Sequence, residues 1–289
     1  PPRSTLFPYT TLFRSTVVRV SSNPNLRETP FLSPKDTYAD GGWDAVKQDA
    51  EEKADLLLSL GINVNLAPVC DMTSDEYGFM YDRSFSSDVD MENRYVRTVV
   101  ETSKSKKLGT VLKHFPGYGN NSDTHTGIAY DDRDYSEFEN TDFKPFYQGI
   151  ESGADCILVS HNIVNCMDSE YPASLSQKVH DILRNEFKFD GVIMTDDLIM
   201  DAITDFTGDE AAAVTAAKCG NDLLCCSSVD TQYPAVLEAV QNGEIPETQV
   251  DASVKRIMKW KQNLGIFNID TYQKKVKSTE PTDTVGSEE

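Results

Sequence analysis

The feature that most constrains the fold is a regular alternation between short apolar segments and longer segments with helical periodicity. Near-continuous apolar strands separated by helices are typical of parallel strands whose two faces are both covered. The sequence therefore predicts an α/β protein. Five strands are expected, at residues 63–69, at the run leading into Lys113, and at 156–160, 191–195 and 222–226. Helices are expected at 44–60, 91–107, 141–152, 176–187, 210–219, 231–242 and 248–264, after a polar loop that ends near Gly41 and Gly42.

Polar residues follow these strands at the point where each one ends. Asp71, His114, His161 and Asp196 all occupy such carboxyl-terminal positions. In a barrel of parallel strands these ends line one mouth, so polar groups far apart in sequence can meet there. A doubly wound open sheet is the alternative architecture. No glycine-rich nucleotide or phosphate motif follows a strand, which favours a TIM-like (β/α)8 barrel.

Bulk properties exclude several classes of protein. The 289 residues are enough for one such domain. A net charge of −20 argues against binding to nucleic acid. No run approaches the roughly 18 to 20 apolar residues of a membrane span. The six cysteines have neither zinc-site nor disulfide-framework spacing, and five of them adjoin apolar runs, so we expect buried free thiols.

The two ends of the chain differ from the centre. Residues 1–15 contain a stretch that looks like a translated sequencing adaptor, and we exclude them as a non-native segment without signal-peptide features. We expect one barrel domain at 16–267 and a loosely attached polar tail at 268–289. On this interpretation the natural sequence before Thr16 is missing, together with any targeting signal. Localisation therefore stays open between the cytoplasm and the cell envelope or secretion.

A central stretch, Lys113 to Gly119, joins a strand end to a polar loop that carries Asp123 and His125. Residues i and i+2 of an extended loop face the same side, so Asp123 can hold and polarise His125. An imidazole with a pKa of about 6.5 can move a proton in either direction near neutrality. A basic strand end followed by a solvated loop is the alternative interpretation.

Asp196 is the candidate nucleophile. A carboxylate at a strand end is often a helix N-cap, but Asp197 can take that role and leave Asp196 facing the mouth. There it can attack an anomeric carbon and form a covalent glycosyl-enzyme. His125 is then the best candidate to protonate the leaving oxygen.

Several donors are suited to sugar hydroxyls and carbonyl oxygens, namely Lys113, His114, Arg83 and Arg19. A loop salt bridge is the alternative role for Arg83. A divalent ion held by His114, His161, Asp71 and Asp196 is the main alternative for this end of the strands. Close histidine pairs such as His-x-His are absent from the sequence, so we predict no metal and no cofactor.

Several motifs in order resemble glycoside hydrolase family 3, in its β-N-acetylglucosaminidase branch. They are Ala67–Asp71, Asp82–Phe85, Lys113–Gly119, Asp123–His125, Gly191–Leu198 and the closing helix from Ser253 to Phe267. The resemblance implies a TIM-like barrel that releases terminal β-linked N-acetylglucosamine from cell-wall or chitin-type glycans with retention of configuration. A small carbohydrate is the implied partner.

The resemblance also implies roles for individual residues. Asp196 matches the nucleophile, and His125 with Asp123 matches an acid/base dyad. Lys113, His114, Arg83 and Asp71 fall at sugar-binding positions. Arg19 matches a binding arginine that follows the family's Asp-x-Glu-Gly-Gly segment.

Two departures from the family pattern leave alternatives open. Tyr118 stands where a second histidine is common, and the Asp-x-Glu-Gly-Gly segment expected before Thr16 is absent. Five strands instead of eight would leave exposed sheet edges and an unfilled core, so we expect this chain to be unstable. The alternatives are an N-acetylglucosaminide phosphorylase, a β-glucosidase of the same family, and a truncated barrel that binds sugar without turnover.

Overall fold

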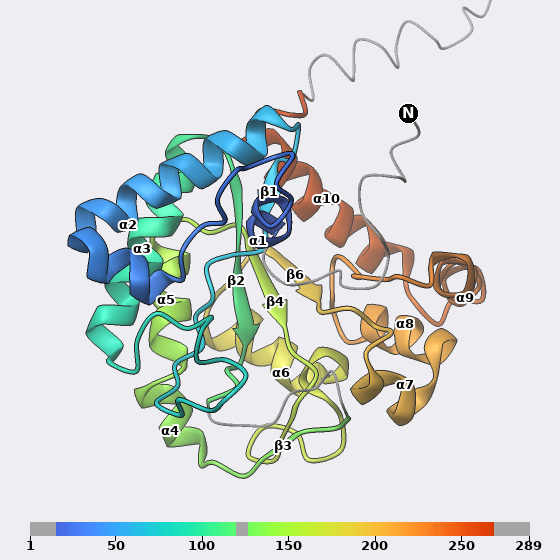
Figure 1. Cartoon of the computed structure of the whole chain (residues 1–289). Coiled ribbons are helices and arrows are strands. Elements are labelled where there is room, and N and C mark those ends of the chain that lie inside the picture. The colour runs from blue at the N-terminus through green and yellow to red at the C-terminus, as the bar shows by residue number, and fades with distance from the viewer. Residues whose placement is uncertain (1–15, 120–126, 269–289) are drawn as a thin grey trace, which may run out of the picture.

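The centre of the molecule is a parallel sheet whose strands are neighbours in the order of the sequence. The computed structural model describes residues 16–119 and 127–268, so Asp123 and His125 lie outside the described residues. The sheet has the order β1-β2-β4-β6, and every pairing is parallel (Figure 1). Its strands are β1 (Val64–Asn65), β2 (Gly109–Phe115), β4 (Cys156–Val159) and β6 (Val192–Thr195). The α/β prediction is confirmed.

The strand order decides between the two expected architectures. A doubly wound sheet reverses its direction of winding part-way, whereas a barrel wall adds each new strand beside the last. Here each strand lies beside the preceding one of the sheet, and a single bridge from Met194 to Leu223 continues the series. The order is therefore that of a barrel wall. Within the described part of the chain the strands do not close into a complete barrel.

One face of the sheet packs against helices that follow its strands. This layer contains α3 (Val89–Ser105), α5 (Phe143–Glu151), α6 (Gln177–Asp181) and a π-helical turn (Ile182–Glu186). Leu112, Ile157 and Ile193 point into it and are fully buried. Phe115 stacks on Phe143 with ring centroids 5.5 Å apart, which extends this apolar core toward the carboxyl ends of the strands.

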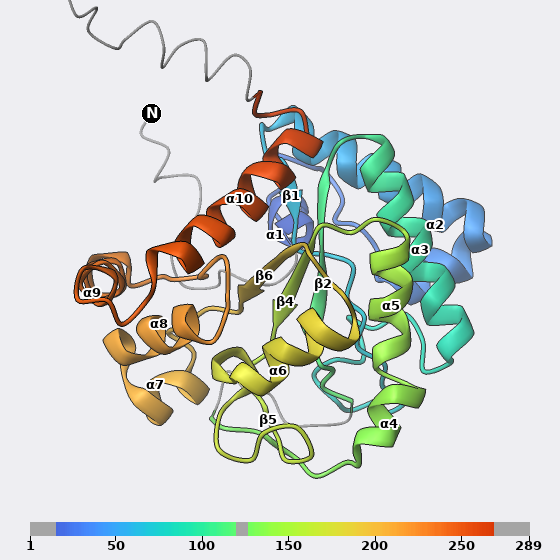
Figure 2. The same ribbon diagram turned by 180° about the vertical axis from the view of Figure 1, so that it is seen from behind.

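The opposite face is covered at the amino ends of the strands by α10 (Glu247–Asn263). Val111, Leu158 and Met194 form a second core with Trp260 and Leu264. Figure 2 shows α2 (Pro34–Ser59), α3 and α5 on one side of the sheet and α10 on the other. Apolar contacts therefore fill both faces near the strand starts and leave the strand ends to polar groups.

The expected polar loop before Gly41 is wrong, because α2 already begins at Pro34. Ser33 caps this helix by accepting a hydrogen bond from the Asp36 N–H at 3.1 Å, and proline is favoured in a first turn. The glycine pair at 41 and 42 interrupts the helix with a kink, since Gly42 has a φ of 64°. The remaining expected helices are confirmed with shifted ends, including α8 (Asp209–Lys218) and α9 (Val229–Gln241).

The strand expected at 222–226 is also wrong, since only Leu223 makes a bridge there. Side chains supplement the few backbone hydrogen bonds between this segment and β6, such as the one from the Asp222 N–H to the Ile193 carbonyl oxygen at 2.8 Å. Asp222 accepts a hydrogen bond from the Ile193 N–H at 2.9 Å, and Thr195 Oγ1 accepts one from the Cys225 N–H at 2.9 Å. The segment expected at 63–69 is likewise strand only at β1, with one further bridge from Val69 to Lys113.

Several short elements had no signal in the sequence. They are α1 (Thr16–Ser21), α4 (Tyr135–Asn140), a 3-10 turn (Ala173–Leu175), α7 (Asp201–Thr207) and a small parallel pair formed by β3 (Tyr130–Asp131) and β5 (Ile163–Val164). All six cysteines are free. Three are buried as expected, whereas Cys225 and Cys226 are half-buried and Cys166 is exposed. None of the described helices is both long and apolar enough to span a bilayer.

Helix α5 lies so close to β2 that only glycine fits at position 149. A Cβ built on Gly149 would lie 2.5 Å from Leu112 Cδ2. We expect Gly149→Ala to lower the free energy of unfolding by about 1–3 kcal/mol through overpacking, despite alanine's better helix propensity of about 1 kcal/mol. Urea denaturation measures this. On a Leu112→Ala background the same change should cost little, and an equal cost in both backgrounds would contradict the steric explanation.

Candidate active site

Four of the polar residues expected at the strand ends do meet there. The arrowheads of β2 and β4 point to the same end of the molecule (Figure 1). Asp71, His114, His161 and Asp196 are each at most 4% exposed. Charged and polar groups that are so buried require partners, so their hydrogen bonds determine what this end of the sheet can do.

A bulge in β2 turns two neighbouring side chains toward this site. Leu112 pairs with Ile157 and Phe115 with Val159, so β2 has one more residue than β4 between the two pairs. Neighbouring side chains normally alternate across a strand, and a bulge is the usual way to change their direction. Lys113 and His114 lie in this bulge, and both act electrostatically on Asp196.

Asp71 organises the tip of β2. One of its carboxylate oxygens, Oδ2, accepts hydrogen bonds from the His114 backbone N–H at 2.9 Å and from His114 Nδ1 at 2.7 Å. The other, Oδ1, accepts one from the Tyr118 N–H at 2.8 Å. Burial alone would raise the pKa of this carboxyl, but His114, the Tyr118 N–H and Arg83 together hold it below its usual value. Asp71 is therefore ionised at neutral pH.

The hydrogen bonds of His114 define its tautomer. Arg83 Nη2 lies 3.1 Å from His114 Nε2, and a guanidinium can only donate. Nε2 is therefore the acceptor, and Nδ1 carries the proton that it donates to Asp71. Burial, with Arg83 and Lys113 nearby, holds the pKa of His114 below its usual value against the opposite effect of Asp71. The ring is neutral at pH 7.

Lys113 is fully buried beside these groups. Burial and the neighbouring Arg83 lower its pKa to about 7, although Asp196 and Asp71 act in the opposite direction. Near neutrality the amine is therefore close to its midpoint between charged and neutral forms.

Asp196 is a buried carboxylate that stays ionised. Burial would raise its pKa, but His114, His161 and Lys113 lower it, helped by the Asp197 N–H, which donates to Oδ1 at 2.9 Å. The net pKa lies below the usual value for aspartate. The side chain therefore has the charge that a nucleophile requires.

Asp197 does not cap a helix as expected, because α7 begins later and Met200 occupies its N-cap position. Instead, Asp197 accepts hydrogen bonds from the N–H and the hydroxyl of Ser227. These bonds tie the end of β6 to the segment that takes the place of the next strand. Asp196 is left facing the cluster, as predicted, but for a different reason.

The structure also places His161 and Arg19, two other residues that were considered for the site. His161 is buried, with Nε2 3.0 Å from the Asp197 carbonyl oxygen and Nδ1 2.7 Å from Ser174 Oγ, so it is a hydrogen-bonded core histidine. Arg19 lies half-buried on α1, and this helix is joined to the β1 region by a bond from the Val17 N–H to Asn65 Oδ1 at 3.3 Å.

Glu92, a fully buried carboxyl in the first turn of α3, is a residue that sequence reasoning missed. Its Oε2 accepts the Ser86 N–H at 2.9 Å and so holds the loop that carries Arg83. Burial raises its pKa well above the usual value. A glutamate three or four positions into a helix is normally a solvated residue or a cap partner, so no local signal distinguishes it.

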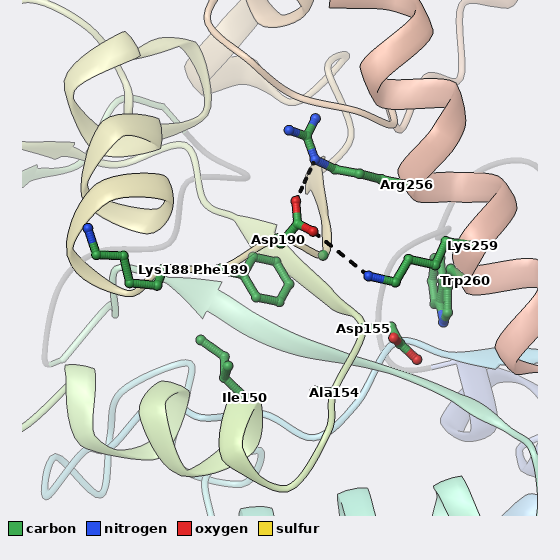
Figure 3. Close-up of a pocket in the computed structure, with 10 residues that line it drawn as sticks. Ile150, Ala154, Asp155, Lys188, Phe189, Asp190, Arg256, Lys259 and Trp260 are labelled. Carbon is green, nitrogen blue, oxygen red and sulfur yellow. Dashed lines mark ion pairs between the residues drawn. The ribbon is translucent and has the colours of Figure 1, made fainter.

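Two hollows lie beside the sheet, and neither is lined by Asp71, His114 or Asp196. One, of about 180 Å³, is lined by Asp155, Gly191 and Trp260 at the amino ends of β4 and β6, the end opposite Asp196. Figure 3 shows Asp190 between Arg256 and Lys259 there, at 3.7 and 3.8 Å. The other hollow, of about 280 Å³, lies among α1, α2 and α3, with Arg83 in its lining.

Metal ligands would have to come from converging histidine, cysteine or acidic side chains. Across 16–119 and 127–268, no three histidine, cysteine or acidic side chains converge as a group that could hold an ion. This part of the chain therefore offers no set of ligands for the divalent ion that was considered as an alternative.

The family model for the glycosyl hydrolase family 3 N-terminal domain matches residues 29–260. The chain belongs to glycoside hydrolase family 3. A beta-hexosaminidase of Hydrogenovibrio crunogenus is 34% identical over 202 residues, covering 69% of this chain and 56% of that protein. One of Nitrosomonas eutropha is 33% identical over 178 residues, covering 61% and 51%. The chain thus spans about half the length of the curated relatives it matches.

Solved structures agree with the family 3 assignment. A family 3 beta-N-acetylglucosaminidase from Paenibacillus has a TM-score of 0.77 at 28% identity, covering 82% of this chain and 46% of that one. A family 3 glycosyl hydrolase from Mycobacterium smegmatis has a TM-score of 0.75 at 27% identity, with coverage of 86% and 77%. The expected family is confirmed, and the sheet belongs to a TIM-like α/β fold.

The buried Asp71–His114 pair should stabilise this family 3 domain strongly. Asp71→Asn removes the charge and places an amide NH2 against either the His114 donors or the Tyr118 N–H, so we expect a loss of about 3–5 kcal/mol in free energy of unfolding at pH 7. The exposed Asp55, which pairs with Lys106 at 2.9 Å, is the matched control, and Asp55→Asn should cost less than about 1 kcal/mol.

The same pair gives a pH dependence with a definite sign. The pKa of Asp71 is depressed in the folded state, so its contribution is complete above the unfolded value of about 3.9 and is lost as pH falls through the folded pKa. The difference between wild type and Asp71→Asn should therefore shrink in acid. A difference that stays constant from pH 7 to the acid limit of folding would contradict this.

The tautomer of His114 can be observed directly. We expect nitrogen NMR to show Nδ1 protonated and Nε2 unprotonated at pH 7, with no titration of this ring near pH 6.5. A His114 signal that titrates with an ordinary imidazole midpoint would show that the bonds from Arg83 and to Asp71 do not hold in solution.

Proposed function

We propose that the protein is a retaining β-N-acetylhexosaminidase that releases terminal β-linked N-acetylglucosamine from cell-wall or chitin-type glycans. The observation that carries the proposal is Asp196, a buried carboxylate kept ionised by Lys113, His114 and His161 at the end of β6 in a family 3 domain. The names of the matched relatives support the substrate class.

The proposed reaction has two steps. In the first, an oxygen of Asp196 attacks the anomeric carbon, the bond from that carbon to the leaving oxygen breaks, and His125 donates a proton to the leaving oxygen. In the second, water attacks the same carbon, His125 takes a proton from the water, and the bond to Asp196 breaks. Asp123 is proposed to orient His125 and to favour its protonated form.

The remaining groups are proposed to bind the sugar. The guanidinium of Arg83 and the ammonium form of Lys113 suit hydroxyl and carbonyl oxygens. For Asp71, predicted as a sugar-binding residue, we propose the additional role of holding His114 in one orientation and one tautomer. Arg19 is proposed as a further binding arginine because of its motif position. The domain bounds of 16–267 stay a prediction, and the family match lies inside them.

The nucleophile can be tested by substitution. With an aryl β-N-acetylglucosaminide, Asp196→Ala should lower kcat by at least ~10³-fold, because no other group can form the glycosyl-enzyme. Asp201→Ala, an exposed carboxylate at the start of α7, should leave kcat unchanged. Mass spectrometry after reaction with a slow fluorinated substrate should place the sugar on Asp196.

The same assay separates the alternatives. Turnover of β-glucosides without turnover of N-acetylated sugars would assign the glucosidase branch. Release of the sugar 1-phosphate when inorganic phosphate is present would assign a phosphorylase. Binding of N-acetylglucosamine by calorimetry with no product from either substrate would leave a sugar-binding domain and contradict the proposal.

A further inference from the structure

Arg83, which contacts His114, is carried by the loop that leads into α3. Its Nη2 lies 3.1 Å from His114 Nε2, and its Nη1 lies 3.3 Å from Met80 Sδ. A long arginine side chain loses much rotamer freedom when it keeps one partner, so its backbone has to be well fixed for the contact to persist. The contacts of this loop therefore decide how Arg83 meets the site.

The chain on the amino side of Arg83 is anchored to α2. Lys35 Nζ donates to the Tyr81 carbonyl oxygen at 2.9 Å and lies 3.2 Å from the centre of the Tyr81 ring. Within the loop, the N–H groups of Arg83 and Ser84 both donate to the Met80 carbonyl oxygen at 2.9 Å. Arg83 therefore lies in a closed turn that one helix holds from the amino side.

The chain on the carboxyl side is held by Glu92 of α3. Its Oε2 accepts the Ser86 N–H at 2.9 Å, and the Phe85 N–H is a second donor to the same carboxyl group. Tyr95 lies three residues further along α3, on the same face of the helix, and its ring stacks on Phe85 with centroids 4.7 Å apart. One face of α3 therefore fixes the two residues that follow the turn.

Glu92 does this from a position where a carboxyl group is costly. The side chain is fully buried, and its Oε1 has no hydrogen-bond partner among the described residues. The helix does not need Glu92 as a cap, because Asp88 is the N-cap residue and accepts the Met91 N–H at 2.9 Å. Burial of a polar group costs free energy unless hydrogen bonds compensate for it. The compensating bonds of Glu92 all go to the loop, which indicates that the loop is its purpose.

We propose that Glu92 is a positioning residue that fixes the N–H groups of Phe85 and Ser86 and so holds Arg83 where its guanidinium donates to His114 and binds the sugar. Glu92 acts on Arg83 through the backbone of the residues between them. The effect on turnover rests on the proposed function, in which Arg83 binds substrate. The effect on His114 rests on the contacts of the described residues alone.

A general contribution to stability is the competing explanation, and two comparisons separate it from positioning. Asp88→Ala removes the cap of the same helix and should lower stability, but it leaves both N–H partners of Glu92 in place. At position 92, glutamine and methionine are both uncharged and similar in length. Only Glu92→Gln keeps an oxygen that can accept from the loop, so it should rescue what Glu92→Met loses.

The first measurement is kcat/KM on an aryl β-N-acetylglucosaminide, at a temperature where circular dichroism shows every variant folded. Glu92→Met should lower kcat/KM ~10-fold, the size expected when a charged donor loses one hydrogen bond to substrate, whereas Glu92→Gln and Asp88→Ala should stay within ~3-fold of wild type. In an Arg83→Ala background, Glu92→Met should have less than ~2-fold further effect, because the group that it positions is already gone.

The second measurement does not require turnover. Nitrogen NMR of His114 Nε2 reports the bond from Arg83, and Arg83→Ala gives the signal of a ring without that bond. Glu92→Met should move the Nε2 signal toward its position in Arg83→Ala, whereas Glu92→Gln and Asp88→Ala should leave it unchanged. If Glu92→Met does not fold, Glu92→Asp takes its place, because it keeps the acid but is one methylene too short to reach the Ser86 N–H.

An unchanged His114 signal in Glu92→Met, or in Glu92→Asp where that variant is used, would overturn the inference. A loss of kcat/KM on Glu92→Met that is as large in the Arg83→Ala background as in wild type would do the same, and so would an equal loss in Glu92→Gln. If wild type itself does not turn over the substrate, the proposed function fails, and the His114 signal then decides the inference separately.

Discussion

The hydrogen bonds of Asp71 are the constraint on which the rest of the site depends. This carboxylate accepts from the backbone of His114, from its ring and from the backbone of Tyr118. It therefore fixes the end of β2, the tautomer of one histidine and the start of the following loop at once. A buried carboxylate without such donors would take up a proton or destabilise the fold, so the site and the stability of this end of the sheet have the same origin.

Neighbouring charged groups shift one another's pKa values, and these shifts decide which protonation state each buried group has. Two buried carboxylates, Asp71 and Asp196, have lowered pKa values because cationic and imidazole groups face them. Burial and the neighbouring Arg83 lower the pKa of Lys113 to about 7, against the opposite effect of these two carboxylates. Glu92 lacks a cation in hydrogen-bonding contact, and burial raises its pKa. The surroundings thus shift the pKa values of these buried carboxyl groups in opposite directions, which is how environment assigns different roles to similar acids.

The alternation of apolar and helical segments was sufficient to predict the sheet and the residues at its strand ends, because both follow from local periodicity. The pattern of apolar residues alone could not predict which contacts hold a segment that lies where a strand is expected. At 222–226 the apolar pattern indicates a strand, but the side chains of Asp222, Thr195 and Asp197 accept three of the backbone N–H groups, and backbone bonds account for only part of the contact. The contact between Arg83 and His114 was also not predicted, because the two residues come from separate segments and no spacing in the sequence relates them.

The distribution of polarity along the strands explains why chemistry is confined to one end. On β2, Val111 and Leu112 pack into the two apolar cores, whereas Lys113 and His114, the next two residues, are equally buried but ionisable. The amino ends are closed by Trp260 and Leu264, and the acidic and basic groups nearby, such as Asp190 with Arg256, pair with each other at the surface. The buried lysine and histidine are exceptions to the apolar pattern of the preceding residues of the strand. Such local conflicts persist only where the surrounding structure compensates for them, and here the compensation is the same set of bonds that orients the site.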